Sequence, residues 1–261
     1  MFTLFIGIQA SKQQLRTAFD IEGYHRRVAR TKPYLSMLNK RYRLQWAKDH
    51  EFWTIQDWLR VIGTDEASFY IGAFRGRVWV TRNAREEFDD QCLVPRFQRH
   101  THVMVWGAIC ADRLGPLVIW DKNWGNITSK AYVEHITDPV LAPFYQRQLM
   151  YSFPYPTYVM QDGAPAHRAQ HTLNAEKKHG IRRIDWPASS PDLNPIETVW
   201  RTMKDKIDDL PIRPSSIPDM IAVVESIWNS LDPQIDILPH IVSLPTRIKA
   251  VIEANGGHIR Y

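Results

Sequence analysis

The spacing of hydrophobic and polar positions changes near residue 60. Beyond it, short runs of β-branched and aromatic residues bounded by Gly, Pro, Asn or Asp predict strands at residues 60–71, 76–82, 101–109, 116–121, 157–162 and 181–186. Apolar residues at helical spacing predict helices at residues 11–19, 39–53, 129–149 and 167–180, and in the stretch that follows Glu197. Several strands followed by alternating strands and helices predict an α/β fold, with a mixed sheet flanked by helices.

Prolines stiffen the start of the helix that contains Glu197. Residues 186–200 read WPASSPDLNPIETVW, with three prolines four residues apart. Asn194 occupies the position expected for an N-cap, Pro195 the first helical position, and Glu197 the third position after the cap. Glu197 could therefore serve only the helix start and its dipole, or it could be aimed at partners from elsewhere in the chain. The apolar positions that follow at helical spacing are Ile196, Val199, Trp200, Met203 and Ile207.

The composition is that of a folded globular protein, with 44% hydrophobic and 23% charged residues. A chain of 261 residues can hold one sizeable α/β domain and an appendage. Cys92 and Cys110 are the only cysteines, which excludes a disulfide framework or a Cys-rich zinc module and fits a reducing compartment. The opening MFTLFIGIQA is apolar for only about eight residues, too few to span a bilayer, so we expect no membrane association.

Basic residues are concentrated near the start of the chain. The formal net charge is +5, yet residues 1–60 alone hold 11 Lys and Arg against 5 Asp and Glu. Eight basic residues and no acid lie between Tyr24 and Lys48, with aromatic residues interleaved. A run without acids favours contact with a polyanion, although a solvated face or helix packing would give the same pattern.

Two acids lie in or at the end of predicted strands, where an acid is costly. Asp162 follows a buried strand and precedes Gly163, at the carboxyl end where α/β sheets bind ligands. Asp65 lies within an apolar run, and Glu66 should point to the opposite face because side chains alternate along a strand. Taken singly, each aspartate is better explained as a turn or cap residue.

Asp65, Asp162 and Glu197 could instead converge into one cluster. Bare carboxylates repel one another, so such a cluster would retain protons unless a cation neutralised it. Oxygen ligands favour Mg²⁺ or Mn²⁺ over zinc. Two such ions about 3.5–4 Å apart could clamp the attacking and leaving oxygens of a phosphoryl displacement. On this interpretation the prolines fix Glu197 so that it meets the other two acids.

Five ordered motifs carry a family resemblance. They are TDEASF, VMVWGAI, QDGAPAH, SPDLNPIETVW and RIKAVIEANGGHIRY, and 34 residues (163–196) separate the last two acids. In these features the chain, from about Ser11 to Tyr261, resembles the DDE transposases of the mariner superfamily. The resemblance implies an RNase H-like fold and places the catalytic triad at Asp65, Asp162 and Glu197.

The resemblance also implies cut-and-paste transposition. Metal-activated water would hydrolyse a phosphodiester at the transposon end, and the freed 3′-hydroxyl would attack target DNA. The implied partners are double-stranded DNA, as terminal inverted repeats and target, and a second copy in a homodimer. A small-molecule organic cofactor is not expected, and the implied location is the nucleus of a eukaryotic host.

Three regions are expected on this basis. Residues 1–55 would be a basic remnant of the DNA-binding region and linker, residues 56–235 the RNase H-like catalytic domain, and residues 236–261 a C-terminal helical tail. Family members usually carry two helix-turn-helix units before the catalytic domain, and we expect most of that region to be missing, since residues 11–33 resemble the last recognition helix and its linker. The predicted DNA-contacting residues are Arg26, Arg27, Arg30, Lys32, Lys40, Arg41, Arg43 and His167.

Weaker patterns leave alternatives open. His167 and His171 have the four-residue spacing of metal ligands but no evident third ligand, so surface histidines are the better interpretation, with His167 near enough to Asp162 to touch DNA or a metal-bound water. The GGH sequence near the C-terminus is too short for a phosphate-binding loop. The rival functions are a transposon-derived DNA-binding protein without transposition activity and an RNase H-like nuclease. Three intact acids disfavour the first, and the 34-residue interval with its SPDLNPIE approach disfavours the second.

Overall fold

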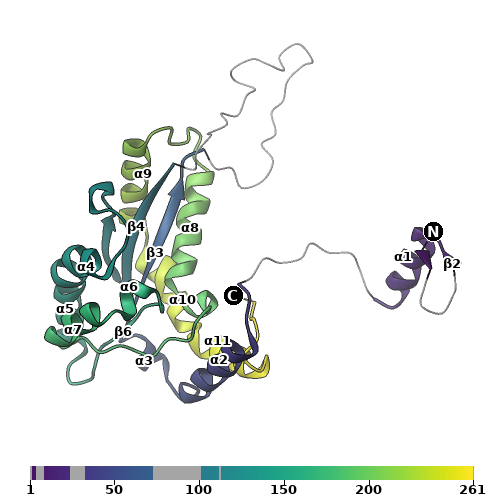
Figure 1. Cartoon of the computed structure of the whole chain (residues 1–261), viewed down its shortest axis with the longest axis horizontal. Helices are drawn as coiled ribbons and strands as arrows, with labels where there is room; N and C mark the ends of the chain where they lie inside the picture. Colours follow the sequence, from purple (N-terminus) through teal and green to yellow (C-terminus); the bar gives the residue numbers. More distant parts are fainter. Residues whose placement is uncertain (1, 4–8, 24–32, 73–100, 112, 261) are drawn as a thin grey trace, which may run out of the picture. The chain divides into compact units, whose positions relative to one another are not determined.

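The computed structural model describes residues 2–3, 9–23, 33–72, 101–111 and 113–260, in two compact units, Met1–Tyr34 and Leu35–Tyr261 (Figure 1). In the first unit, strands β1 (Phe2–Thr3) and β2 (Gln9–Ala10) pair antiparallel. Helix α1 (Lys12–Ile21) follows, and its start is fixed by a capping box between Ser11 and Gln14. The helix predicted at residues 11–19 is thereby confirmed.

A four-stranded mixed sheet lies at the centre of the second unit. Its order is β5-β4-β3-β6, with β3 antiparallel to β4 and parallel to β6. The strands are β3 (Val61–Tyr70), β4 (His102–Cys110), β5 (Arg113–Ile119) and β6 (Tyr158–Met160). The prediction of a mixed sheet flanked by helices is confirmed, while the strand predicted at residues 76–82 lies outside the described residues.

The strand predicted at residues 181–186 is wrong. This segment forms one isolated parallel bridge, between Val159 and Arg183. Its backbone hydrogen bonds to β6 run from the Val159 amide to the Arg182 carbonyl, at 2.7 Å, and from the Ile184 amide to the Val159 carbonyl, at 3.0 Å. Both use the single residue Val159, so the segment borders β6 without extending a ladder along it.

Side-chain alternation along β3 divides the core into two clusters. Ala67 and Phe69 pack in the cluster formed with α8 (Ile196–Asp208), α9 (Ile217–Ser230) and α11 (Leu244–Glu253). Ile62 packs in the other, with helices that follow β5. These are α4 (Ser129–Tyr132), a π-helical segment (Val133–Leu141) and α5 (Ala142–Ser152). Figure 1 shows α8 and the pair α4 and α5 on opposite sides of the sheet.

Two predicted helices are interrupted. The helix expected at residues 129–149 changes to π-helical geometry around Pro139, which lacks the amide that a continuous α-helix needs. The helix expected at residues 167–180 begins earlier, as α6 (Pro165–Arg168), and resumes as α7 (Gln170–Lys178) after Ala169 adopts an extended backbone. The early start places His167 inside α6.

The basic segment before the sheet folds against the C-terminal helices. Helix α2 (Met37–Asp49) packs on α11, and α3 (Ile55–Trp58) contacts both α10 (Leu238–Val242) and α11. The buried face of α2 carries Arg43, Trp46 and Ala47, which follow the helical spacing i, i+3 and i+4. Across the described residues, every helix is too short or too polar to cross a bilayer.

Candidate active site

The structure brings the three predicted acids together. Asp65 lies midway along β3, and Asp162 lies two residues beyond the end of β6. Because Gly63 pairs in parallel with Met160, both acids reach the same level of the sheet. Glu197 is the second residue of α8, and its charge acts on Asp65, while Asp162 acts on both.

The start of α8 is attached directly to β3. The Asn194 side-chain amide donates to the Thr64 carbonyl at 3.2 Å, one residue before Asp65. Asn194 Oδ1 also accepts from the Ile196 amide at 3.4 Å. The helix begins one residue later than predicted, with Pro195 and not Asn194 at the N-cap. The backbone amide of Asn194 donates to the Pro191 carbonyl at 3.0 Å. It therefore does not donate to the Glu197 side chain, as a capping box would require. Asn194 thereby ties the start of α8 to β3 beside Asp65, and the charge of Glu197 acts on that acid.

Asp65 is held by the indole of Trp200. Trp200 Nε1 donates to Asp65 Oδ2 at 3.2 Å. The indole fits because Gly107, which pairs with Asp65 across the sheet, has no side chain, and a Cβ there would lie 2.5 Å from the ring. Burial, followed by the charges of Glu197, Glu66 and Asp162, raises the pKa of Asp65 well above its usual value.

Glu197 resembles Asp65 in its electrostatics. Burial is the largest cause of its raised pKa, and the charge of Asp162 adds to the effect. The cationic Lys204 and Arg201, two turns and one turn further along α8 respectively, oppose the shift only in part. Two of the three acids thus disfavour their own ionised form in the absence of a cation.

Asp162 is different, because it contacts a histidine. Asp162 Oδ1 lies 2.8 Å from His167 Nδ1 and accepts from the Ala164 amide at 2.9 Å. The hydrogen bond with His167 is the largest cause of the lowered pKa of Asp162. Burial would lower the pKa of His167, but Asp162 and Glu66 outweigh it and raise that pKa to about 10.

The prediction that His167 contacts DNA is wrong. Only 2% of its surface is exposed, because α6 turns it inward between Asp162 and Glu66. His171, on α7, is exposed as expected of a surface histidine. Glu66 was not among the predicted site residues, although strand alternation placed it on the face opposite Asp65. Its contact with His167 confirms that orientation and makes it a fourth acid beside the site.

The donor set fits hard divalent cations. Within the described ranges, no group of three or more His, Cys, Asp or Glu side chains is placed so that it could hold a metal ion. Burial first, and neighbouring carboxylates second, raise the pKa values of Asp65 and Glu197, and a cation bound beside them would oppose both shifts. Carboxylate oxygens are the ligands that Mg²⁺ and Mn²⁺ prefer.

The basic run is not a uniform surface, and the prediction that Arg43 contacts DNA is wrong. Arg43 is 0% exposed and forms a bidentate ion pair with Asp192, with both N–O distances 2.8 Å. Arg41 is exposed and Lys40 is half-buried on the same helix. The other predicted basic contacts, Arg26, Arg27, Arg30 and Lys32, lie outside the described residues.

The GGH sequence serves this ion pair. Arg43 Nε donates to the Gly256 carbonyl at 3.0 Å, and Nη2 donates to the Gly257 carbonyl at 3.2 Å. Gly256 has a φ of +78°, and a Cβ there would lie 1.9 Å from the Lys40 carbonyl, so only glycine allows this approach. The Asp192 carbonyl accepts from Arg247 Nη1 at 3.0 Å. We call the Arg43–Asp192 pair with these contacts the arginine clamp.

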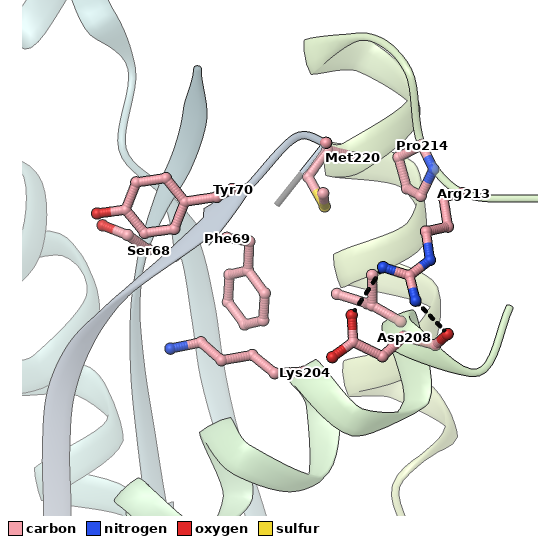
Figure 2. A pocket seen from close by; sticks show the side chains of 10 residues that line it. Ser68, Phe69, Tyr70, Lys204, Asp208, Arg213, Pro214 and Met220 are labelled. Atoms are coloured by element: carbon pink, nitrogen blue, oxygen red, sulfur yellow. Dashed lines mark hydrogen bonds and ion pairs between the residues drawn. The ribbon is translucent and has the colours of Figure 1, made fainter. Parts of the chain in front are cut away.

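A cavity of about 330 Å³ lies further along β3 and α8 (Figure 2). Phe69, Tyr70 and Lys204 line it, with Arg213 bonded to Asp208 at its side. The three acids are not among its lining residues. The candidate site is therefore the carboxylate cluster and not this cavity.

Comparison with known proteins gives consistent matches. The family of DDE superfamily endonucleases matches residues 60–217. The chain is 30% identical over 252 residues to the transposable element Tc1 transposase of Caenorhabditis elegans, covering 96% of this chain and 88% of that protein. The fold superposes on a Mos1 transposase paired-end complex with left transposon end (TM-score 0.73, 15% identity, 95% of this chain and 71% of the other). It also superposes on the Mos1 catalytic domain with raltegravir and Mn (TM-score 0.67, 13% identity, 87% of this chain and 100% of the other).

Proposed function

Because the chain belongs to the DDE superfamily of endonucleases, among the relatives of the Tc1 transposase, we propose that Asp65, Asp162 and Glu197 are the residues with which this DNA transposase cleaves phosphodiester bonds. The observation that carries the assignment is their convergence from β3, the end of β6 and the start of α8. Burial and the neighbouring carboxylates raise the pKa values of Asp65 and Glu197, so a cation would favour their ionised forms.

The three carboxylates would hold two divalent ions, Mg²⁺ or Mn²⁺. When bound, such ions lower the pKa of water and neutralise charge on a phosphodiester. Solved structures of the Mos1 catalytic domain with Mn and with Mg support the choice of metal. In this chain, Trp200 orients Asp65, His167 orients Asp162, and the Asn194 contact with β3 fixes the position of Glu197.

The substrate would be double-stranded DNA, first at the terminal inverted repeats and then at the target. Hydrolysis frees a 3′-hydroxyl, whose oxygen would then attack a phosphodiester of the target strand and displace that strand's own 3′-oxygen, so that the two DNAs are joined. A Mos1 complex that contains paired transposon ends supports a homodimer as the working assembly. Relatives from nematodes support a eukaryotic host and therefore action in the nucleus.

Cleavage of labelled duplexes that carry the repeats flanking the coding region tests the proposal. We expect nicking that requires Mg²⁺ or Mn²⁺ and that Glu197→Gln abolishes, although this variant preserves the length of the side chain. Glu225→Gln, an exposed glutamate on α9, is the matched control and should cleave normally. Normal cleavage by Glu197→Gln would refute the catalytic role of Glu197.

A further inference from the structure

A buried histidine joins two carboxylates, Glu66 on β3 and Asp162 on the segment beyond β6. His167 Nδ1 contacts Asp162 Oδ1 at 2.8 Å, and its Nε2 lies 3.3 Å from Glu66 Oε1. Neither Nε2 nor Oε1 has a hydrogen-bond partner of good geometry among the described residues, and both are buried. The two atoms therefore rely on each other for compensation of their charge.

The surroundings hold the imidazole in this orientation. Its ring packs on that of Tyr132, with centroids 4.5 Å apart. The Tyr132 hydroxyl accepts from Trp106 Nε1 at 3.1 Å and donates to Gln161 Oε1 at 3.0 Å. Gln161 precedes Asp162 in the chain, so the same buried network fixes the wall behind the imidazole and the backbone that carries the carboxylate.

We propose that His167 is a positioning residue that orients Asp162 for metal binding, and that Glu66 holds His167 in place. The inference rests on the proposed function and extends it to two residues outside the three-acid cluster. Asp162 needs such support more than the other acids, because it is exposed on a loop beyond β6, whereas Asp65 and Glu197 lie within a strand and a helix. Without the Nδ1 contact, the Ala164 amide alone would hold Asp162 Oδ1, and the carboxylate would be less firmly oriented for a cation.

The test measures metal binding separately from catalysis. Mn²⁺ affinity of the DNA-free chain is measured by calorimetry, and the Mn²⁺ concentration for half-maximal cleavage is measured on DNA. His167→Ala should raise the Mn²⁺ dissociation constant and the half-maximal Mn²⁺ concentration each by about 10–100-fold. His171→Ala removes an exposed histidine four residues away and should change neither value.

Two substitutions of Glu66 separate positioning from general packing. Glu66→Gln preserves an acceptor oxygen opposite Nε2 and should retain an Mn²⁺ affinity near that of the wild type. Glu66→Leu has a similar size without an acceptor and should weaken Mn²⁺ binding about as much as His167→Ala. A purely structural role would instead lower the melting temperature of these variants without changing their Mn²⁺ affinity once folded.

Each outcome decides the matter. Wild-type Mn²⁺ affinity in folded His167→Ala overturns the inference alone. If His167→Ala does not fold, the comparison of Glu66→Gln with Glu66→Leu decides, and equal affinities of those two variants overturn the inference. A wild-type chain that binds no Mn²⁺ overturns the proposed function and this inference together.

Discussion

The arginine clamp pairs opposite buried charges, whereas the carboxylate cluster brings like charges together. In the clamp, Nη1 and Nη2 of Arg43 donate to the Asp192 carboxylate, and the carbonyls of Gly256 and Gly257 accept further hydrogen bonds from Arg43. In the cluster, Asp65 and Glu197 face each other, and their pKa values are raised. Asp162 contacts His167 directly, and Lys204 and Arg201 offset the raised pKa of Glu197 only in part.

This difference in charge pairing distinguishes a site that stabilises the fold from a site that is suited to bind a ligand. A buried ion pair with complete hydrogen bonding stabilises one arrangement of the segments it joins, here α2, the loop before α8 and the C-terminal tail. Like charges gathered without full compensation destabilise the fold unless a ligand supplies the missing charge. Removal of charge should therefore have opposite effects on stability at the two places.

The largest effect is expected at the cluster, in activity. Asp65→Asn retains the acceptor for Trp200 but removes the negative charge, and it should reduce metal-dependent strand cleavage by well over 100-fold, more than the loss of a positioning contact. The same change should raise the melting temperature of the metal-free chain, since it removes repulsion with Glu197. Cleavage assays and thermal melts of one preparation test both. A fall in both quantities would show that Asp65 is a structural residue.

The next largest effect is expected at the clamp, in stability. Arg43→Met leaves the Asp192 carboxylate buried without its partner and should lower the free energy of unfolding by about 3–5 kcal/mol. Denaturant titration measures this change. Adding Asp192→Leu should restore much of the stability, because the double variant contains no uncompensated charge. A loss below about 1 kcal/mol for Arg43→Met would contradict the assignment of the clamp.

The third effect is the dependence of the free energy of unfolding on pH and on bound metal. The raised pKa of Asp65 means that the folded state binds more protons than the unfolded state, so the free energy of unfolding of the metal-free chain should fall as pH rises from about 4 through the folded pKa. Mn²⁺ at about 100 times its dissociation constant should add about 2.7 kcal/mol. Asp162 has the opposite sign, because its lowered pKa contributes stability that is lost as pH falls through the folded value.

Denaturation curves over a pH series, with and without Mn²⁺, measure both effects. In Asp65→Asn, the decline with pH should be reduced and the Mn²⁺ increment lost. An unchanged Mn²⁺ increment in that variant would place the metal elsewhere.

Local sequence pattern indicated where each acid lies, whereas their assignment to one triad came from the family resemblance. Strand alternation placed Asp65 and Glu66 on opposite faces, and the turn after a buried strand placed Asp162 at a carboxyl end. The prolines before Glu197 indicated a fixed helix start. These features depend on the chain within a few residues of each acid, which is the range over which sequence pattern is informative.

The partners of charged residues could not be predicted in this way. Asp192 lies 149 positions from Arg43, and no local pattern connects them. A signal was nevertheless present on α2, since Arg43 shares the buried face of Trp46 and Ala47. The count of basic residues obscured this helical spacing. The burial of His167 was missed for another reason, because α6 begins at Pro165, before the predicted helix.

The smallest effect contrasts two arginines of one helix. Arg41 is exposed on α2, whereas Arg43, two residues later, is fully buried. Arg41→Met should change the free energy of unfolding by no more than about 0.5 kcal/mol. If Arg41 contacts a phosphate, the variant should also reduce the slope of log K against log salt for duplex DNA by about 0.9. Titrations against labelled duplex at several salt concentrations measure that slope. An unchanged slope would show that Arg41 only faces solvent, and destabilisation equal to that of Arg43→Met would remove the distinction between the two arginines.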